Sequence, residues 1–203
     1  MKIALLGATG QVGSQLLTEA LSRGHVVTGV ARYTDALPLH PALRPKKVDI
    51  TDYAELPDVL AGHDVVVLSI PFRSFDGTAL ISAVKESRVP RLLVVGGAGS
   101  LEVAPGIVLV DTPDFPVEYK TEALAGRDFL NVLRGESSLN WTFLSPSAFL
   151  HSGPRTGIFR LGRDSLLVAD DGNSHISIAD YAIAFIDELE KPNHSQARFT
   201  VGY

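Results

Sequence analysis

The chain has 203 residues, of which 18 are lysine or arginine and 23 are aspartate or glutamate, for a net charge of −5. This length suits one compact domain with a substantial core, and the acidic balance with scattered basic residues argues against nucleic acid as a partner. Cysteine does not occur, which excludes disulfides, thiolate catalysis and cysteine-ligated metals, so any redox chemistry needs a bound cofactor.

The hydrophobic runs are short throughout the chain. None reaches the length of a membrane span, and the run at the beginning is too short for a signal peptide. The six histidines show no pairs at metal-ligand spacing, so no metal site is expected. We therefore expect a cytoplasmic protein, a monomer or a homodimer, that binds neither membranes nor nucleic acid.

The chain begins with the pattern strand, glycine turn, helix. Residues 2–6 form an apolar run of strand length, and apolar residues recur at helical spacing over 14–21. Glycines between them allow a tight turn, let backbone N–H groups approach a pyrophosphate at the helix N-terminus, and let the helix pack close to the strand. A tight turn alone is the alternative interpretation. The stretch predicts a dinucleotide-binding loop made by Gly7, Thr9, Gly10, Gln11, Val12 and Gly13.

A second strand, rich in β-branched residues, is predicted over 25–31, and Arg32 follows it directly. In dinucleotide sites an acidic residue at this place accepts hydrogen bonds from the ribose hydroxyls, whereas an arginine pairs with a 2′-phosphate. Arg32 therefore favours NADP over NAD. The alternative is an arginine that is simply solvated in a loop.

Three prolines predict a loop over 38–45, followed by a short third strand over 46–49. Asp49 and Ile50 would then lie at the carboxyl edge of the sheet. The Asp49 carboxylate could accept a hydrogen bond from the adenine amino group, or it could cap a helix over 53–61. The sequence leaves both roles open.

Two further runs are typical of buried parallel strands, namely 64–70 and 91–95, with a helix over 78–86 between them. Open α/β sheets bind ligands outside the carboxyl ends of their strands. We therefore expect the residues at these ends to line the nicotinamide half of the cofactor site: Ser69, Ile70, Gly96 and Gly97.

The rest of the chain predicts a helix over 117–134, a strand over 140–144, a last helix over 178–190 with Ser177 as its N-cap, and a terminal strand over 197–201. Between them, residues 149–171 are rich in glycine and polar residues, with strand-like pieces at 157–160 and 165–168. We interpret residues 149–175 as a small cap on the substrate side.

With these motifs in place, the chain resembles the atypical short-chain dehydrogenase/reductase proteins of the NmrA-like and NADH-flavin reductase branch. The resemblance rests on the glycine turn, Arg32, Asp49 and the pattern of residues 175–182. It implies one α/β domain over 1–203, with a doubly wound, mostly parallel Rossmann sheet flanked by helices. It also implies that the pattern near the end positions the C-terminal helix.

The sequence departs from that superfamily at the catalytic Tyr-x-x-x-Lys pair. Tyr119 and Lys120 are adjacent, and on a helix they would point about 100° apart. Lys120 is kept as a candidate cofactor ligand and Tyr119 as the candidate catalytic proton donor. A related biliverdin/flavin reductase carries serine and histidine where this chain has Gly97 and Ala148, so its tetrapyrrole chemistry is not carried over.

Hydride transfer to a flavin or quinone needs less from a protein than ketone reduction does, because the acceptor is an electron sink and water can supply protons. The sequence and the resemblance together predict an NADPH-dependent oxidoreductase acting on a small planar acceptor. A non-catalytic NADP(H)-sensing regulator is the alternative, and a sugar-nucleotide epimerase is the weakest candidate. The residues expected around the acceptor are Ser69, Phe72, Tyr119, Pro146 and Phe149, although core packing could equally explain the two phenylalanines.

Overall fold

The computed structural model describes residues 1–203. The chain divides into two compact units that interleave along the sequence: Met1–Val94 with Ser137–Trp141, and Val95–Glu136 with Thr142–Tyr203. We call them the first and the second unit and describe each by itself. The single domain expected from the sequence stays a prediction.

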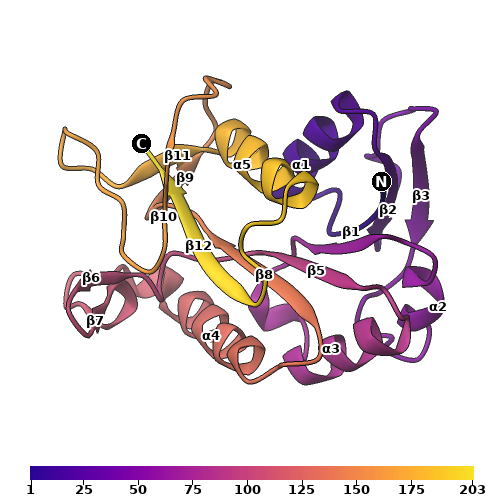
Figure 1. Cartoon of the computed structure of the whole chain (residues 1–203), viewed down its shortest axis with the longest axis horizontal. Helices are drawn as coiled ribbons and strands as arrows, with labels where there is room; N and C mark the ends of the chain where they lie inside the picture. Colours follow the sequence, from indigo (N-terminus) through magenta and orange to yellow (C-terminus); the bar gives the residue numbers. More distant parts are fainter. The chain divides into compact units, whose positions relative to one another are not determined.

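The first unit is built on parallel strands in the order β5-β4-β1-β2-β3. Helix α1 lies on one face of these strands, and α2 and α3 lie on the other (Figure 1). The elements are β1 (Lys2–Leu6), α1 (Gln11–Ser22), β2 (Val26–Ala31), β3 (Leu43–Lys47), α2 (Leu56–Leu60), β4 (Val65–Leu68), the 3-10 turn η1 (Phe72–Ser74), α3 (Gly77–Glu86) and β5 (Arg91–Val95).

The apolar runs of the first unit are buried because they form parallel strands inside the sheet, as predicted from the sequence. Strand β1 pairs on one side with β2 and on the other with β4, and all of β4 is buried. A strand that has neighbours on both edges and helices on both faces exposes no side chain to water, so it is apolar without alternation. Leu16, Leu17 and Ala20 form the buried side of α1.

The second unit combines a small mixed sheet with two long helices. Strand β12 pairs in parallel with β8 and antiparallel with β10, while β9 and β11 form a separate parallel pair. Helices α4 and α5 lie on opposite sides of β8 and β12 (Figure 1). The elements are β6 (Glu102–Ala104), β7 (Ile107–Val108), η2 (Leu109–Asp111), α4 (Val117–Arg134), β8 (Asn140–Ser145), β9 (Phe149–His151), β10 (Arg160–Gly162), β11 (His175–Ser177), α5 (Ile178–Glu190) and β12 (Ala197–Gly202).

This α/β architecture, with mostly parallel strands and flanking helices, is typical of a Rossmann fold and confirms the predicted fold class. None of the helices is both long and apolar enough to cross a membrane.

Four predicted elements have the wrong bounds. Strand β3 runs over Leu43–Lys47 instead of 46–49, and it contains Pro45. The strand pairs only with β2, and an edge strand tolerates proline because one side of its backbone needs no donor. Helix α2 begins at Leu56 rather than at residue 53. Residues 165–168 form only an isolated bridge, between Ser165 and Glu102, and the piece expected at 157–160 is β10 at Arg160–Gly162.

Candidate cofactor-binding site

The turn between β1 and α1 requires glycine at two positions. Gly7 has a φ of +87°, and a Cβ atom there would lie 2.1 Å from the Ser69 carbonyl oxygen. A Cβ atom at Gly13 would lie 2.1 Å from the Gly7 carbonyl oxygen, so α1 packs directly on the turn. The turn is closed by hydrogen bonds from the Gly7 N–H to the Val30 carbonyl oxygen (2.9 Å) and from the Gly10 N–H to the Gly7 carbonyl oxygen (3.0 Å).

The N-terminus of α1 carries no negative side chain. Its N-cap is Gly10, which offers no side-chain acceptor, and the first turn contains no acidic residue. The leading N–H groups of a helix have no intrahelical partner, and the helix dipole adds positive potential at this end. This end of α1 therefore favours a bound anion such as a pyrophosphate.

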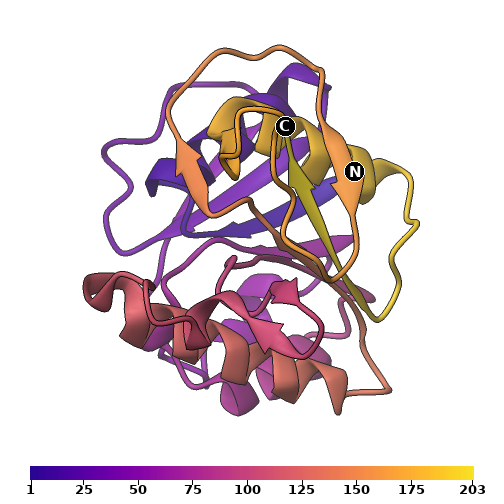
Figure 2. The same ribbon diagram turned by 90° about the vertical axis from the view of Figure 1, so that its left-hand side faces the viewer.

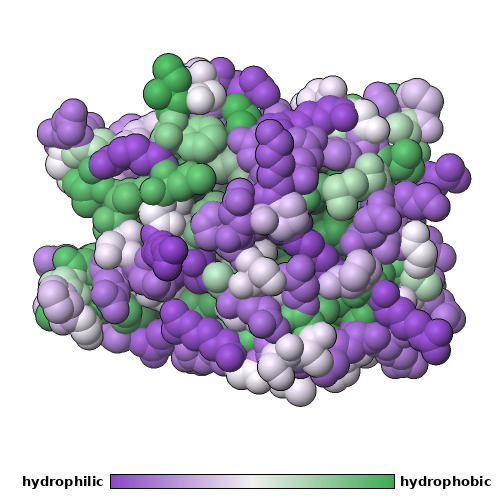
Figure 3. All heavy atoms as spheres, in the orientation of Figure 1, coloured by the Kyte–Doolittle hydropathy of each residue, from purple (hydrophilic) through white to green (hydrophobic).

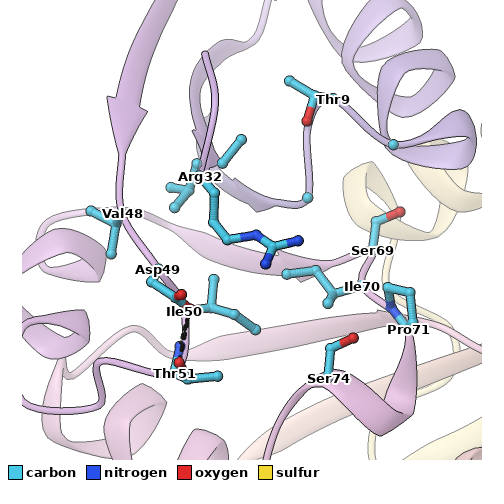
Figure 4. Close-up of a pocket in the computed structure, with 14 residues that line it drawn as sticks. Thr9, Arg32, Val48, Asp49, Ile50, Thr51, Ser69, Ile70, Pro71 and Ser74 are labelled. Atoms are coloured by element: carbon cyan, nitrogen blue, oxygen red, sulfur yellow. Dashed lines mark hydrogen bonds between the residues drawn. The ribbon is translucent and has the colours of Figure 1, made fainter.

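A cavity of about 430 Å³ opens beside this turn. Arg32 extends from the end of β2 across the cavity toward Ile70, with Asp49 and Ile50 on one side and Ser69 on the other (Figure 4). The lining residues all belong to the first unit: Gly7, Thr9, Gly10, Val30, Ala31, Arg32, Val48, Asp49, Ile50, Thr51, Ser69, Ile70, Pro71 and Ser74.

Asp49 is held in place by Thr51. Its Oδ1 accepts hydrogen bonds from the Thr51 N–H (3.0 Å) and from the Thr51 hydroxyl (2.8 Å). These two hydrogen bonds, with a smaller effect from the positive charge of Arg32, hold the pKa of the Asp49 carboxyl below its ordinary value. Asp49 does not cap α2, because that helix begins after Glu55. Of its two candidate roles, contact with an adenine ring stays a prediction.

The cavity brings together eight of the residues predicted from the sequence to bind the cofactor: Gly7, Thr9, Gly10, Arg32, Asp49, Ile50, Ser69 and Ile70. Gln11 and Val12 lie next to it, in the first turn of α1, and Gly13 is buried against Gly7. Phe72 lies in η1, half-buried, with its ring centroid 6.3 Å from that of Phe75.

Six lining residues were missed by the sequence analysis: Val30, Ala31, Val48, Thr51, Pro71 and Ser74. All lie at or soon after the carboxyl end of β2, β3 or β4. Ligands of open α/β sheets bind at the carboxyl ends of the strands, so applying this rule to every residue of each loop would have predicted these six as site residues.

The remaining predicted residues belong to the second unit, where their roles stay predictions. The Gly96 N–H donates to the Leu144 carbonyl oxygen (2.8 Å), and a Cβ atom at Gly96 would lie 2.3 Å from the Phe143 ring. Gly97 follows it, half-buried, and Pro146 is buried at the end of β8. Tyr119 and Lys120 are exposed on α4, with 64% of Tyr119 accessible.

Phe149 is 64% exposed and stacks on His151, with ring centroids 5.1 Å apart and planes inclined by 22°. Core packing therefore does not explain this phenylalanine. One of its ring faces is covered by an imidazole, while much of the side chain remains accessible to a ligand.

With this geometry established, comparison with known proteins gives the family. A model of NAD(P)H-binding proteins matches residues 7–189. The chain belongs to the NAD(P)H-binding family. Protein YwnB of Bacillus subtilis is 42% identical over 219 aligned residues, which cover 99% of this chain and 98% of YwnB.

Two solved structures have the same fold over the whole chain. A putative epimerase from Bacteroides thetaiotaomicron matches with a TM-score of 0.95 and 44% identity, covering 100% of this chain and 96% of that one. A putative NADH-flavin reductase from Streptococcus pneumoniae matches with a TM-score of 0.87 and 36% identity, covering 100% and 99%.

Proposed function

We propose that this protein is an NADPH-dependent oxidoreductase that transfers hydride to a small planar acceptor such as a flavin or a quinone. The observation that carries the proposal is the position of Arg32, a cation in the cavity next to the N-terminus of α1. The residues at the end of β2, where an acidic group would select NAD, include no carboxylate. The flavin part of the proposal is supported by the name of the pneumococcal relative.

The lining residues fit a dinucleotide that carries an extra phosphate. The unopposed N-terminus of α1 would hold the pyrophosphate, and the guanidinium of Arg32 would pair with the 2′-phosphate. The hydrogen bonds from Thr51 use one oxygen of Asp49, which leaves the other able to accept from the adenine amino group. Ser69, Ile70 and Lys120 are proposed contacts for the rest of the cofactor, with Gly96 and Gly97.

Bound NADPH supplies the hydride, and the acceptor takes it together with one proton, so that a quinone becomes a hydroquinone and the nicotinamide is oxidised. The protein's own part is to bind the acceptor and deliver the proton. We propose that Phe149 stacks on the acceptor ring, with Phe72 and Pro146 as further contacts, and that the Tyr119 hydroxyl donates the proton.

Tyr181 lies in the motif of residues 175–182 and, unlike Tyr119, is unsuited to proton transfer. It is fully buried, and its hydroxyl donates a 2.7 Å hydrogen bond to the Leu144 carbonyl oxygen. Burial raises the pKa of this hydroxyl further. The side chain therefore anchors α5 to the end of β8.

Turnover tests the proposal directly. The purified chain is mixed with NADPH and with a panel of free flavins, quinones and carbonyl compounds, and NADPH oxidation is followed by its absorbance. We expect oxidation with flavins or quinones and none with simple ketones. Turnover of ketones alone would contradict the planar-acceptor proposal.

A second candidate, a non-catalytic NADP(H)-sensing regulator, is favoured by one observation. Tyr119 is exposed, and Lys120 follows it directly on α4, so the two cannot form the Tyr-x-x-x-Lys pair in its usual geometry. Tight NADPH binding without turnover of any acceptor in the panel would support the regulator. As further proposals from the sequence, the protein is cytoplasmic, a monomer or a homodimer, with a small planar acceptor as its partner.

A further inference from the structure

The sequence motif at residues 175–182 makes hydrogen bonds to another segment of the second unit, and the proposed function does not explain them. Ser177 is the N-cap of α5 and accepts a hydrogen bond from the Asp180 N–H (3.0 Å). The same hydroxyl donates to the Pro154 carbonyl oxygen (2.8 Å). The cap of α5 therefore also holds a distant part of the chain.

That part is the irregular segment of residues 152–158, which we call the strap. It contains no helix or strand, and every residue in it is exposed. Figure 2 shows the chain between β9 and β10 as a wide orange arch. Ile158, Leu161 and Val168 expose hydrophobic side chains, and hydrophobic atoms gather over this part of the second unit in Figure 3.

The buried carboxylate of Asp180 holds the middle of the strap. Asp180 is 0% exposed, and its Oδ1 accepts hydrogen bonds from the Thr156 N–H (2.8 Å) and the Gly157 N–H (2.9 Å). Its Oδ2 accepts from the Thr156 hydroxyl and from the Tyr203 hydroxyl, the latter at 2.7 Å. Four donors converge on one charged group, and such hydrogen bonds are stronger than neutral ones.

The strap also contacts the ring of His151. A Cβ atom at Gly153 would lie 3.0 Å from His151 Cε1 and 3.0 Å from Ser177 Cβ, so the backbone at Gly153 packs closely against both residues. The ring of His151 in turn stacks on Phe149. The His151 ring also stacks on His175, with ring centroids 5.7 Å apart, and Tyr203 packs edge-on against His175.

A continuous series of contacts thus leads from Asp180 through the strap to Phe149. We propose that Asp180 is a positioning residue for the planar acceptor: by holding the strap it keeps Gly153 against His151, and so orients the ring of Phe149 on which the acceptor stacks. This inference rests on the proposed function, which assigns Phe149 to the acceptor.

Two near-isosteric variants test it without removing the buried charge. Thr156→Val and Tyr203→Phe each delete one hydroxyl that donates to Asp180. We expect each to raise the KM for the acceptor by about fivefold, the effect of losing one hydrogen bond, with the Kd for NADPH unchanged. Asp180→Asn should raise this KM further, and Asp170→Asn, which removes an exposed carboxylate from the irregular chain between β10 and β11, serves as the matched control.

Two readouts separate positioning from a general loss of structure. Amide hydrogen exchange at Thr156 and Gly157, whose N–H groups donate to Asp180, should accelerate in Asp180→Asn, while exchange in α1 stays as in the wild type. In a Phe149→Leu background, Thr156→Val should no longer change the acceptor KM, because the ring through which it acts has been removed.

The outcomes distinguish failure of the proposed function from failure of the inference about Asp180. If the wild-type protein turns over no acceptor, the proposed function fails and the inference fails with it. If the wild type turns over the acceptor, but Thr156→Val and Tyr203→Phe leave its KM unchanged, the inference alone is overturned. An equal effect of Thr156→Val with and without Phe149 would also overturn it, since the strap would then act by another route.

Discussion

Replacing Arg32 by alanine should remove the preference for NADPH over NADH. Arg32 follows β2, and its side chain crosses the cavity next to the N-terminus of α1 (Figure 4). NADPH and NADH differ only in the 2′-phosphate, so a cation that contacts this group changes the affinity for one cofactor and not for the other.

The magnitude follows from the kind of contact and from its exposure. A hydrogen bond to a charged group contributes about 1.5–3 kcal/mol, and solvent lowers the contribution of an exposed ion pair. Arg32 lines the cavity and is exposed to solvent. We therefore expect Arg32→Ala to cost about 1–3 kcal/mol of NADPH binding, which raises the Kd about 5-fold to 150-fold.

Calorimetric titration of NADPH and NADH into wild type and variant measures this effect. The NADH affinity should change little in Arg32→Ala. Arg32→Lys is the matched control, because it keeps the charge but loses the planar fork of donors, and it should bind NADPH with intermediate affinity. Equal affinities of the wild type for both cofactors, or an equal loss of both in Arg32→Ala, would refute the role assigned to Arg32.

Three further predictions concern stability and proton delivery. Gly13→Ala should destabilise the fold by about 1–3 kcal/mol in urea unfolding, because its Cβ would lie 2.1 Å from the Gly7 carbonyl oxygen; an unchanged midpoint would contradict this close packing. Hydrogen bonds to Asp180 outweigh desolvation and lower the pKa of its carboxyl, so its stabilisation is complete above the unfolded pKa and is lost as the pH falls through the lower, folded value. Asp180→Asn should therefore be less stable by about 1–3 kcal/mol at neutral pH and should lose less stability on acidification, as measured by denaturant unfolding at several pH values. Tyr119→Phe should slow NADPH oxidation and alter its pH profile, and a variant with the wild-type rate and profile would rule out the proton-donor role.

Elements with strong local signals were predicted accurately from the sequence. The structure places β5 at Arg91–Val95 and α4 at Val117–Arg134, the same ranges as predicted. The first is a short, largely apolar run of strand length, which is typical of a buried parallel strand. The second lies between Pro116 and Gly135, two residue types that are unfavourable inside a helix, because proline lacks a backbone N–H and glycine loses much backbone entropy there.

Elements that depend on distant partners were not predicted. Strands β9 and β11 have three residues each, and the pairing joins Phe149 to His175 across the whole segment between them. Three residues are too few to show a period, so no local pattern could identify them. The range predicted for β3 was wrong for a related reason. This strand can contain Pro45 only because it lies at the edge of the sheet, which the local sequence does not show.

The same distinction applies to the functional residues. The glycine turn and Arg32 could be predicted because their role depends on the strand and the helix next to them in sequence. Asp180 was predicted only as part of a motif that positions the last helix. That part of its role is local, because the Ser177 side chain caps the helix by accepting from the Asp180 N–H. Its carboxylate is instead engaged by Thr156, 24 residues before it, and by Tyr203, 23 residues after it. A motif of small and polar residues can therefore predict where a helix begins. The distant residues that bind its side chains depend on which segment the fold brings to that end of the helix.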